Sequence, residues 1–341
     1  MSGIGEKVTS IDVAERAGVS QSAVSRVFTP GASVSKQTAD KVRKAASELG
    51  YRPNILARAM STGRSRIIGL VLAYLDNHFY PEALEKLSHS LQEQGYHVLM
   101  FFASNASDID SVLEEILAYQ VDGIVMASVG MSSELSERCE AAGVPVVLFN
   151  RLQDDDRFSG VASDNLAGGR LVAEFLYRGG HRRIAHIAGW PGAMTARDRE
   201  AGLLAGLQEA GLLLHGRALG NYRLDEARAA TRTLFARPTP PDAIFVANDH
   251  MAFAVMDVLR HEMGLDVPGD VSVVGYDDVE IAAWPSYDLT TVRQPAAEMV
   301  AATVEAMLAR ITAPNDPPRR IAVPSPLIVR SSARCPEGWP E

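Results

Sequence analysis

The chain has 341 residues, of which 47% are hydrophobic, and this suits two or three domains with a sizeable core. No apolar run is long enough to cross a membrane, and the first ten residues lack the apolar stretch of a secretory signal. The two cysteines, Cys139 and Cys335, provide neither a disulfide framework nor a metal site. These features predict a cytoplasmic protein with no metal or other cofactor and no membrane partner.

The net charge of −9 is unevenly distributed along the chain. Residues 1–66 carry 11 Lys and Arg against 5 Asp and Glu, a net charge of +6, whereas the remainder carries −15. A basic head on an acidic body is what phosphate binding by the head alone requires. Charge does not distinguish a DNA-binding surface from a solvated basic one, so the interpretation depends on the motifs in this head.

The segment Thr9–Val27 has the pattern of two short helices joined by a tight turn. Asp12 follows Thr9 at capping-box spacing, and the apolar face ends at Gly18, which tolerates a left-handed backbone. Ser20 is placed to cap a second helix with inward-facing Ala and Val. Such a pair predicts a helix-turn-helix, whose second helix can lie in a DNA major groove, although a plain helical hairpin has the same pattern. The outward-facing residues are Gln21, Ser22, Ser25 and Arg26.

A third helix is predicted over residues 36–48, begun by Ser35 and ended by Gly50. The apolar segment Asn54–Ser61 that follows can form a helix but is too short to be stable alone. It either becomes ordered on a partner or serves as an interdomain linker. Residues 62–66 continue as a Ser/Gly/Arg linker.

From residue 67 onward, short apolar runs alternate with amphipathic helical stretches. Continuous apolar strands with helical crossovers predict parallel sheets covered on both faces, and two similar sets predict two doubly wound lobes. The predicted strands cover residues 67–75, 97–103, 123–127, 144–149, 183–188, 243–247 and 271–275. The predicted helices cover residues 82–94, 109–119, 165–178, 197–209 and 251–263.

Polar residues gather where these predicted strands end. Doubly wound sheets bind ligands at the carboxyl ends of their strands, and two facing lobes form a cleft there. Each such residue is a binding candidate, and each is also compatible with a helix cap or a contact between lobes. The loops concerned are residues 76–80, 150–151, 248–249 and 277–278, with 293–294 at a crossover.

Several short motifs in the first 60 residues carry a resemblance to a known family. They are Asp12-Val13-Ala14, Ala17-Gly18-Val19-Ser20, Val24-Ser25-Arg26-Val27, Val34-Ser35, Gly50-Tyr51 and Pro53-Asn54. In this combination they resemble the signature of the lactose/galactose-repressor family of bacterial transcription regulators. The implied fold class is α/β: an N-terminal all-α helix-turn-helix DNA-binding domain and a two-lobed, doubly wound effector domain of the periplasmic-binding-protein type.

The resemblance also implies domain boundaries. The DNA-binding domain would take residues 1–53, and a hinge helix with its linker residues 54–66. The effector-binding and dimerisation domain would take residues 67–331, with a tail over residues 332–341. Lobe 1 would comprise 67–162 with 293–321, and lobe 2 would comprise 163–292 with 322–331.

In the resembled family, the hinge helix orders on the operator and inserts a Leu into the minor groove beside its dimer mate. The alignment places Met60 at that position, still an apolar wedge, with Asn54 and Ala57 in the same helix. The residues expected to read base edges are Gln21, Ser22 and Arg26. Those expected to contact phosphate are Ser20, Ser25, Lys36 and Asn54. We expect a homodimer on a palindromic, double-stranded operator, and no tetramer because the tail has no heptad.

The resemblance assigns effector-binding roles to loop residues of both lobes. They are Asn77, His78, Phe79, Tyr80, Asn150, Arg151, Arg199, Tyr222, Asn248, Asp277 and Gln294. Two of them depart from the family pattern: Asn150 replaces an Asp, and His78 replaces a Pro. The expected pocket then sets Arg151 and Arg199, with His78 as a further source of positive charge, against Asp277, and this favours a carboxylate or phosphate on the ligand. We therefore expect a sugar acid or similar anionic metabolite, with a neutral sugar as the alternative because Asn still accepts hydroxyl hydrogen bonds.

The sequence thus predicts a DNA-binding regulator, expected to be a repressor, of genes for carbohydrates or related metabolites. An exported sugar-binding protein would leave residues 1–60 unexplained. An enzyme is not expected, because the sequence has no G-x-G-x-x-G after a strand, no Walker lysine and no G-x-S-x-G elbow. Two points stay open: whether Trp284 caps the cleft or only packs, and whether the ligand is an inducer or a co-repressor.

Overall fold

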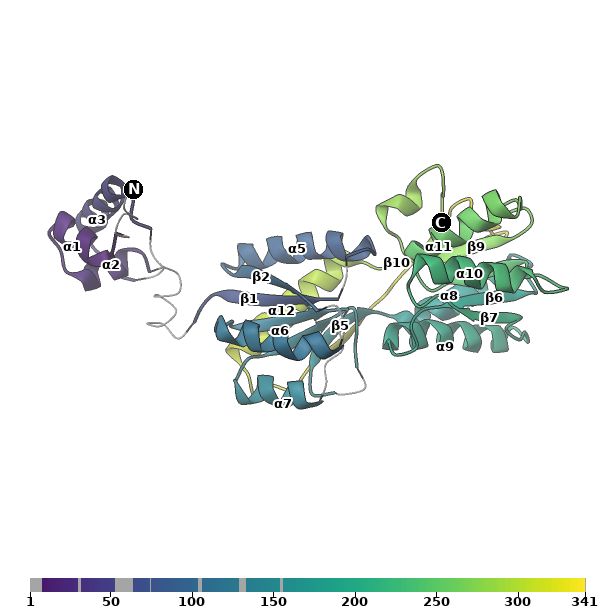
Figure 1. Cartoon of the computed structure of the whole chain (residues 1–341), viewed down its shortest axis with the longest axis horizontal. Helices are drawn as coiled ribbons and strands as arrows, with labels where there is room; N and C mark the ends of the chain where they lie inside the picture. Colours follow the sequence, from purple (N-terminus) through teal and green to yellow (C-terminus); the bar gives the residue numbers. More distant parts are fainter. Residues whose placement is uncertain are drawn as a thin grey trace, which may run out of the picture. The chain divides into compact units, whose positions relative to one another are not determined.

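The computed structural model describes residues 8–29, 32–52, 64–73, 75–103, 106–128, 133–153 and 156–340. The chain forms two compact units, Met1–Ser65 and Arg66–Glu341, which are drawn in Figure 1. The predicted hinge-helix residues Asn54, Ala57 and Met60 lie outside the described residues.

The first unit is built from three helices with well-formed ends. Helix α1 (Ser10–Ala17) starts with the predicted capping box between Thr9 and Asp12 and ends at Gly18 in the left-handed conformation, with φ 67°. Helix α2 (Gln21–Val27) is capped by Ser20, whose hydroxyl accepts from Ala23 N. Helix α3 (Lys36–Leu49) runs from a Ser35 cap to a left-handed Gly50. The α1–α2 pair is therefore a helix-turn-helix, with α3 closing its core.

The core of this unit is small and consists of aliphatic side chains from all three helices. Val13, Val24 and Val42 are buried at its centre, with Ala14, Ala45 and Ala46 around them. Phe28 and Tyr51 pack against this cluster from the ends of α2 and α3. Inward packing of Val24 leaves the polar residues of α2 on the outer surface.

The second unit contains two sheets, each with six strands, and these form the two lobes that the sequence predicted (Figure 1). The first sheet has the order β11-β5-β4-β3-β1-β2 and is parallel throughout. Its strands are β1 (Ile67–Leu72), β2 (His97–Phe102), β3 (Gly123–Ala127), β4 (Val146–Phe149), β5 (Ser159–Ser163) and β11 (Arg320–Val323).

The second sheet has the order β12-β10-β9-β8-β6-β7, and only the β10–β12 pair is antiparallel. Its strands are β6 (Ile184–Ala188), β7 (Gly216–Leu219), β8 (Ala243–Val246), β9 (Ser272–Asp277), β10 (Thr290–Arg293) and β12 (Leu327–Ile328).

Helices cover both faces of each sheet, which explains the continuous apolar runs of the central strands. On the first sheet, α5 (Phe79–Glu93) and α12 (Ala296–Thr312) pack on one face, and α6 (Ala106–Ala118) and α7 (Ser133–Ala141) on the other. On the second sheet, α8 (Asn165–Arg178) and α9 (Met194–Glu209) cover one face, and α10 (Leu224–Phe235) and α11 (Asp249–Asp257) the other (Figure 1). Helix α11 continues as a π-helical turn, Val258–Glu262, and a 3-10 turn covers Glu280–Ala283.

The chain passes between the two sheets three times. The strands that flank the crossings end at Ser163, Arg293 and Val323; the sequence placed the boundaries after residues 162, 292 and 321. Three crossings side by side make a hinge region between the lobes, and the carboxyl ends of the central strands face it.

The last residues of the chain pack on the second lobe rather than extending as a tail. The Ser332 hydroxyl donates to Val273 O at 2.7 Å, and the Trp339 ring lies edge-on to Phe175 with centroids 5.0 Å apart. This segment therefore covers the end of helix α8. Among the described residues, no helix is long and apolar enough to cross a membrane.

Several elements were not predicted from the sequence. They are α7, α10, α12 and the strands β5, β7, β10, β11 and β12. Most of these strands have two to four residues or lie at a sheet edge, so their apolar pattern is weak. Helix α9 begins at Met194, three residues before the predicted start, and this brings Thr195 into its first turn.

Candidate functional site

The outer face of α2 presents the polar residues that the sequence singled out. Ser20, Gln21, Ser22, Ser25 and Arg26 are all exposed. The Gln21 amide donates to the Ser10 hydroxyl at 3.0 Å, and the Arg26 Nε donates to Ser22 O at 3.3 Å. The first bond joins α2 to α1, and the second holds the exposed Arg26 side chain along its own helix.

In the second unit, loops from both lobes converge on one small polar cavity. Residues after β1 and β4 form the wall from lobe 1, and residues after β6, β7, β8 and β9 form the wall from lobe 2. The lining residues are Asn77, Tyr80, Asn150, Arg151, Thr195, Arg199, Tyr222, Asn248 and Asp277. Eight of the eleven predicted effector-binding residues are therefore brought together here.

The carboxylate of Asp277 is the centre of this cavity. It is 2% exposed, and the Asn77 amide reaches it across the cleft, donating to Oδ2 at 3.0 Å. Gln294, at the second crossing, donates to Oδ1 at 2.6 Å. The Asp277 backbone has φ 127°, a strained conformation for a residue with a side chain. Asp277 thus joins lobe 1, lobe 2 and the hinge through one side chain.

Arg199 is the cationic partner of this carboxylate. It is 3% exposed, and its Nη1 lies 3.6 Å from Asp277 Oδ1 and also donates to Ala247 O. Its Nε donates to Asn165 Oδ1 at 2.8 Å, and its guanidinium carbon lies 3.6 Å from the centroid of the Tyr276 ring. Burial lowers the pKa of Arg199, but Asp277 and the nearby hydroxyls of Tyr222, Tyr276 and Tyr80 act together against it, and the pKa is raised. Arg199 is therefore fixed and charged.

Asn150 and Arg151 form the opposite wall. Asn150 has φ 56°, and its amide donates to Tyr80 Oη at 3.4 Å, while its buried Oδ1 has no partner among the described residues. Arg151 Nη1 donates to Ser128 O at 2.6 Å, and its guanidinium carbon lies 5.3 Å from the centroid of the Trp190 ring. A buried amide oxygen without a partner is costly, which marks Asn150 as a place for a ligand donor.

The other predicted residues have different surroundings. Asn248 lines the cavity but also caps α11, since its Oδ1 accepts from Met251 N at 3.0 Å. Phe79 is buried and stacks on Phe149, with centroids 6.2 Å apart. His78 is exposed and does not line the cavity, so the positive charge expected from it is not there. Trp284, left open by the sequence, is 49% exposed and also lies outside the lining.

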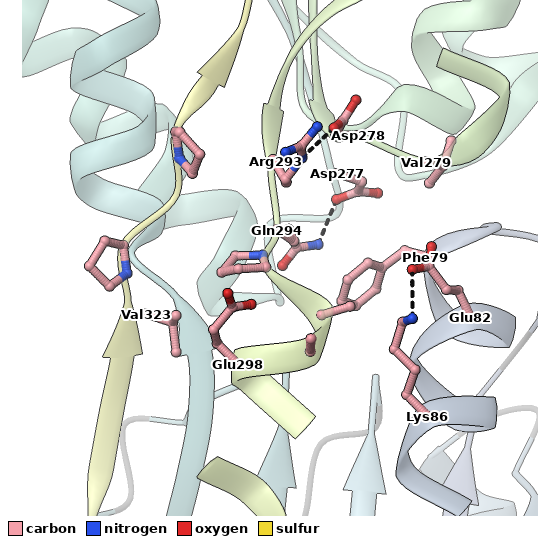
Figure 2. Close-up of a pocket in the computed structure, with 15 residues that line it drawn as sticks. Phe79, Glu82, Lys86, Asp277, Asp278, Val279, Arg293, Gln294, Glu298 and Val323 are labelled. Carbon is pink, nitrogen blue, oxygen red and sulfur yellow. Dashed lines mark hydrogen bonds and ion pairs between the residues drawn. The ribbon is translucent and has the colours of Figure 1, made fainter. Parts of the chain in front are cut away.

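The cavity is contracted. Its volume is about 20 Å³, room for one or two water molecules rather than a sugar. A larger cavity of about 490 Å³ lies on the other side of Asp277 and Gln294, against Phe79 and the start of α12 (Figure 2). In its wall, Asp278 accepts from Arg293 Nε, as Figure 2 shows, and pairs with Arg330 at 2.6 Å.

Sequence reasoning did not single out four residues that support the cavity. Asn165, Ser163 and Tyr276 lie behind Arg199 and Gln294: the Ser163 hydroxyl is 3.2 Å from Tyr276 Oη and donates to Gln294 Oε1 at 3.1 Å. Trp190 lies against Arg151. The Gly-Trp-Pro-Gly sequence directly after a predicted strand was the only available signal for Trp190.

The two units together define a class: a helix-turn-helix regulator with a two-lobed body of the periplasmic-binding-protein type. Residues 10–54 match the family description "Bacterial regulatory proteins, lacI family", and residues 173–333 match "Periplasmic binding protein-like domain". The ribose operon repressor of Escherichia coli strain K12 is 33% identical over 95% of this chain and 99% of its own length.

Two solved structures resemble the chain over nearly its full length. A lac repressor dimer bound to operator and the anti-inducer ONPF has a TM-score of 0.86 at 28% identity, covering 96% of this chain and 99% of that one. A complex of the transcriptional regulator CelR with cellobiose has a TM-score of 0.73 at 31% identity, covering 96% of this chain and 100% of that one. This chain belongs to the lacI family of bacterial regulatory proteins. It is a transcription regulator and not an enzyme, as the sequence predicted.

Buried acids around the cavity give a testable pH dependence. Burial raises the pKa of Asp249, whose carboxylate accepts from Val279 N and Thr291 Oγ1, and the negative Asp277 raises it further. The pKa of Asp249 is therefore higher in the folded state than in the unfolded state, where it is about 4. Because of this difference, the contribution of Asp249 to stability is largest below about pH 4 and becomes smaller as the pH rises.

Asp249→Asn removes this titration while keeping the size of the side chain. We expect its free energy of unfolding, relative to the parent, to increase with pH above about 4, by about 1.4 kcal/mol per pH unit while only the native carboxyl stays protonated. Denaturant unfolding at several pH values between 4.5 and 8 measures this difference. The exposed Asp225→Asn serves as the control, and a constant difference for Asp249→Asn would contradict the assignment.

Proposed function

We propose that this protein is a homodimeric repressor of carbohydrate genes whose operator affinity is set by a sugar-like ligand bound around Asp277. The observation that carries the proposal is the polar cavity between the lobes. Asp277 in this cavity contacts Asn77 of lobe 1, Arg199 of lobe 2 and Gln294 at a crossing. A ligand that enters the cavity must therefore alter contacts between the lobes. A ligand with different affinity for two lobe arrangements shifts the balance between them.

DNA reading is assigned to helix α2. Gln21, Ser22 and Arg26 are exposed on its outer face and would contact base edges, while Ser20 and Ser25 would contact phosphate with Lys36 and Asn54. The net charge of +6 on residues 1–66 supplies the general attraction to DNA. Met60 and Ala57 of the hinge segment would enter the minor groove of the operator.

A polyhydroxylated ligand suits the lining. Tyr80 and Tyr222 offer ring faces, and the amides of Asn77, Asn150 and Asn248 are at the cavity wall. A ligand hydroxyl would donate to the unpartnered Asn150 Oδ1. Support comes from the similarity to a ribose operon repressor and to a regulator whose structure contains cellobiose.

The charge balance of the lining favours an acid group on this ligand. Arg199 is neutralised by the ion pair with Asp277, 3.6 Å away, so this pair adds no net charge to the lining. Arg151 is then the unbalanced cation among the described lining residues, with its Ser128 bond to a neutral carbonyl. A single carboxylate would pair with it, so we assign the effector to the sugar acids.

Lobe motion would connect this ligand to DNA. Because the cavity is contracted and the Asn77–Asp277 bond closes it, a sugar acid enters only when the lobes separate and then re-close around it. Re-closure at a different angle would change the spacing of two dimer-related hinge segments. Better binding to the operator-competent arrangement makes the ligand a co-repressor, and better binding to the other makes it an inducer.

The edge strand β2 is the candidate dimer face. It borders the first sheet, and its outward side chains Met100 and Phe102 are 48% and 50% exposed. Exposed apolar side chains on a sheet edge are a favourable contact for a second copy. A two-fold axis beside this edge would present two α2 helices to a palindromic site.

Arg26→Ala should remove most operator preference and leave weak, salt-sensitive binding. The lost guanine contact is worth about 1–3 kcal/mol per half-site, whereas phosphate contacts remain. Selection from a randomised duplex pool supplies the operator, and titrations against it and a scrambled duplex measure the preference. Arg16→Ala is the matched control, because Arg16 pairs with Glu48 at 2.8 Å within the unit. Unchanged discrimination by Arg26→Ala would refute the assignment.

Sugar acids should stabilise the full-length protein more than their neutral parents. At about 100 times its dissociation constant a ligand adds about 2.7 kcal/mol, a shift of several degrees in Tm. The panel is galacturonate with galactose, gluconate with glucose and ribonate with ribose. A response to neutral sugars alone would overturn the acid assignment and retain sugar binding.

Replacing both Met100 and Phe102 by Glu should convert the dimer to a monomer. Like charges facing each other across a two-fold axis oppose association, and the apolar contact is lost. Sedimentation velocity gives the mass, and circular dichroism checks that the fold is intact. Leu213→Glu, at an exposed loop position, should remain dimeric. A dimeric double variant would place the interface elsewhere.

A further inference from the structure

Trp190 and Arg151 form a contact that exists only because the two lobes lie together. Arg151 follows β4 of the first sheet, and Trp190 lies between β6 of the second sheet and α9. The guanidinium carbon is 5.3 Å from the ring centroid, within the range of a cation–π interaction. Trp190 is 49% exposed, and Arg151 is half-buried.

The loop that carries Trp190 holds the indole in one place. A Cβ atom on Gly192 would clash with the six-membered ring of Trp190, so the indole can occupy this position only beside a glycine. Ala193 N donates to Trp190 O at 3.0 Å, and the Ala193 side chain is buried. The loop backbone therefore leaves room for the indole beside Gly192.

The contact with Trp190 does not use the N–H groups of Arg151, which are the groups that bind a carboxylate. A guanidinium stacks through its flat face and donates hydrogen bonds from its edges. The guanidinium carbon of Arg151 lies over the Trp190 ring at 5.3 Å from its centroid, and Nη1 donates to Ser128 O at 2.6 Å. The remaining edge is compatible with a bidentate carboxylate, because stacking and edge bonding do not compete, and Arg151 lines the cavity.

We infer that Trp190 is a positioning residue that makes the site selective for a carboxylate ligand. The indole of lobe 2 orients the Arg151 guanidinium of lobe 1 with its free edge toward the cavity. This orientation is available only while the lobes are together, so acid recognition is tied to the closed arrangement. The inference rests on the proposed effector site and adds a residue outside its lining.

The first arm of the test needs no ligand. The fluorescence of Trp190 in the full-length protein is obtained as the difference between the parent and Trp190→Phe, and acrylamide quenching measures its accessibility. Without Arg151 over the ring, Arg151→Ala should raise the quenching constant of this component about twofold. Trp284, equally exposed and outside the cavity, gives a control difference that Arg151→Ala should not change. An unchanged Trp190 constant would overturn the contact.

The second arm measures selectivity with the acid and neutral pairs named above. Trp190→Ala should weaken binding of the stabilising acid about tenfold and leave its neutral parent within twofold, and Trp190→Phe should retain most of the acid preference. In Arg151→Gln, adding Trp190→Ala should cause no further loss, because both act through one guanidinium. Trp284→Phe should behave as the parent.

The outcomes separate the inference from the proposed function. If the parent prefers acids and Trp190→Ala leaves the acid-to-neutral ratio unchanged, the positioning role is refuted and the effector site stands. Equal weakening of acid and neutral ligands also refutes the positioning role, because Trp190 would then contribute to binding without selecting the carboxylate. If the parent binds no acid, the assigned effector class fails, and carboxylate selectivity by Trp190 fails with it.

Discussion

The buried carboxylate of Asp277 is the constraint on which the rest of the body depends. A charge removed from water is tolerated only when donors surround it, and loss of one donor leaves an uncompensated charge. The donors here come from three places: Asn77 in lobe 1, Gln294 at a crossing and Arg199 on helix α9. The arrangement of the lobes therefore determines which groups surround the Asp277 carboxylate. A change in that arrangement changes the environment of Asp277, and a new partner for Asp277 changes the contacts between the lobes.

This dependence explains why strain and order are concentrated at the hinge. Asp277 has φ 127° and the next residue, Asp278, has φ 55°, so the chain turns sharply after β9. Asp278 bonds Arg293 and Arg330, which hold the second crossing and the C-terminal segment against that turn. Ser163 links the first crossing to Gln294. A polar ligand that replaces Asn77 as donor to Asp277 would thus act on the point where the crossings are tied together.

Much of this could be predicted from the sequence because its signals are local. Thr9, Asp12 and Gly18 set the helix-turn-helix through caps and a left-handed turn, and the helix over Asn165–Arg178 was predicted with its observed bounds. The carboxyl-end rule for parallel strands located most of the cavity lining in advance. The strands β5 and β10 were missed because they have four or five residues with a high share of Ser, Thr, Gly or Arg, and β11 because it is a four-residue edge strand; neighbouring strands rather than their own pattern select the extended conformation.

The pairing of charges was beyond the reach of sequence reasoning, and it changes the chemical argument. The sequence placed two arginines and a histidine against one acid, which favours an anionic ligand by simple counting. In the folded chain His78 is outside the lining and Arg199 is paired with Asp277. Arg151 is therefore the cation among the described lining residues that favours an anionic ligand. On the proposed assignment, what Arg151 selects depends on which of its N–H groups remain available, and Trp190 and the Ser128 carbonyl would set this. Specificity would then depend on neighbours of the cavity as well as on its lining.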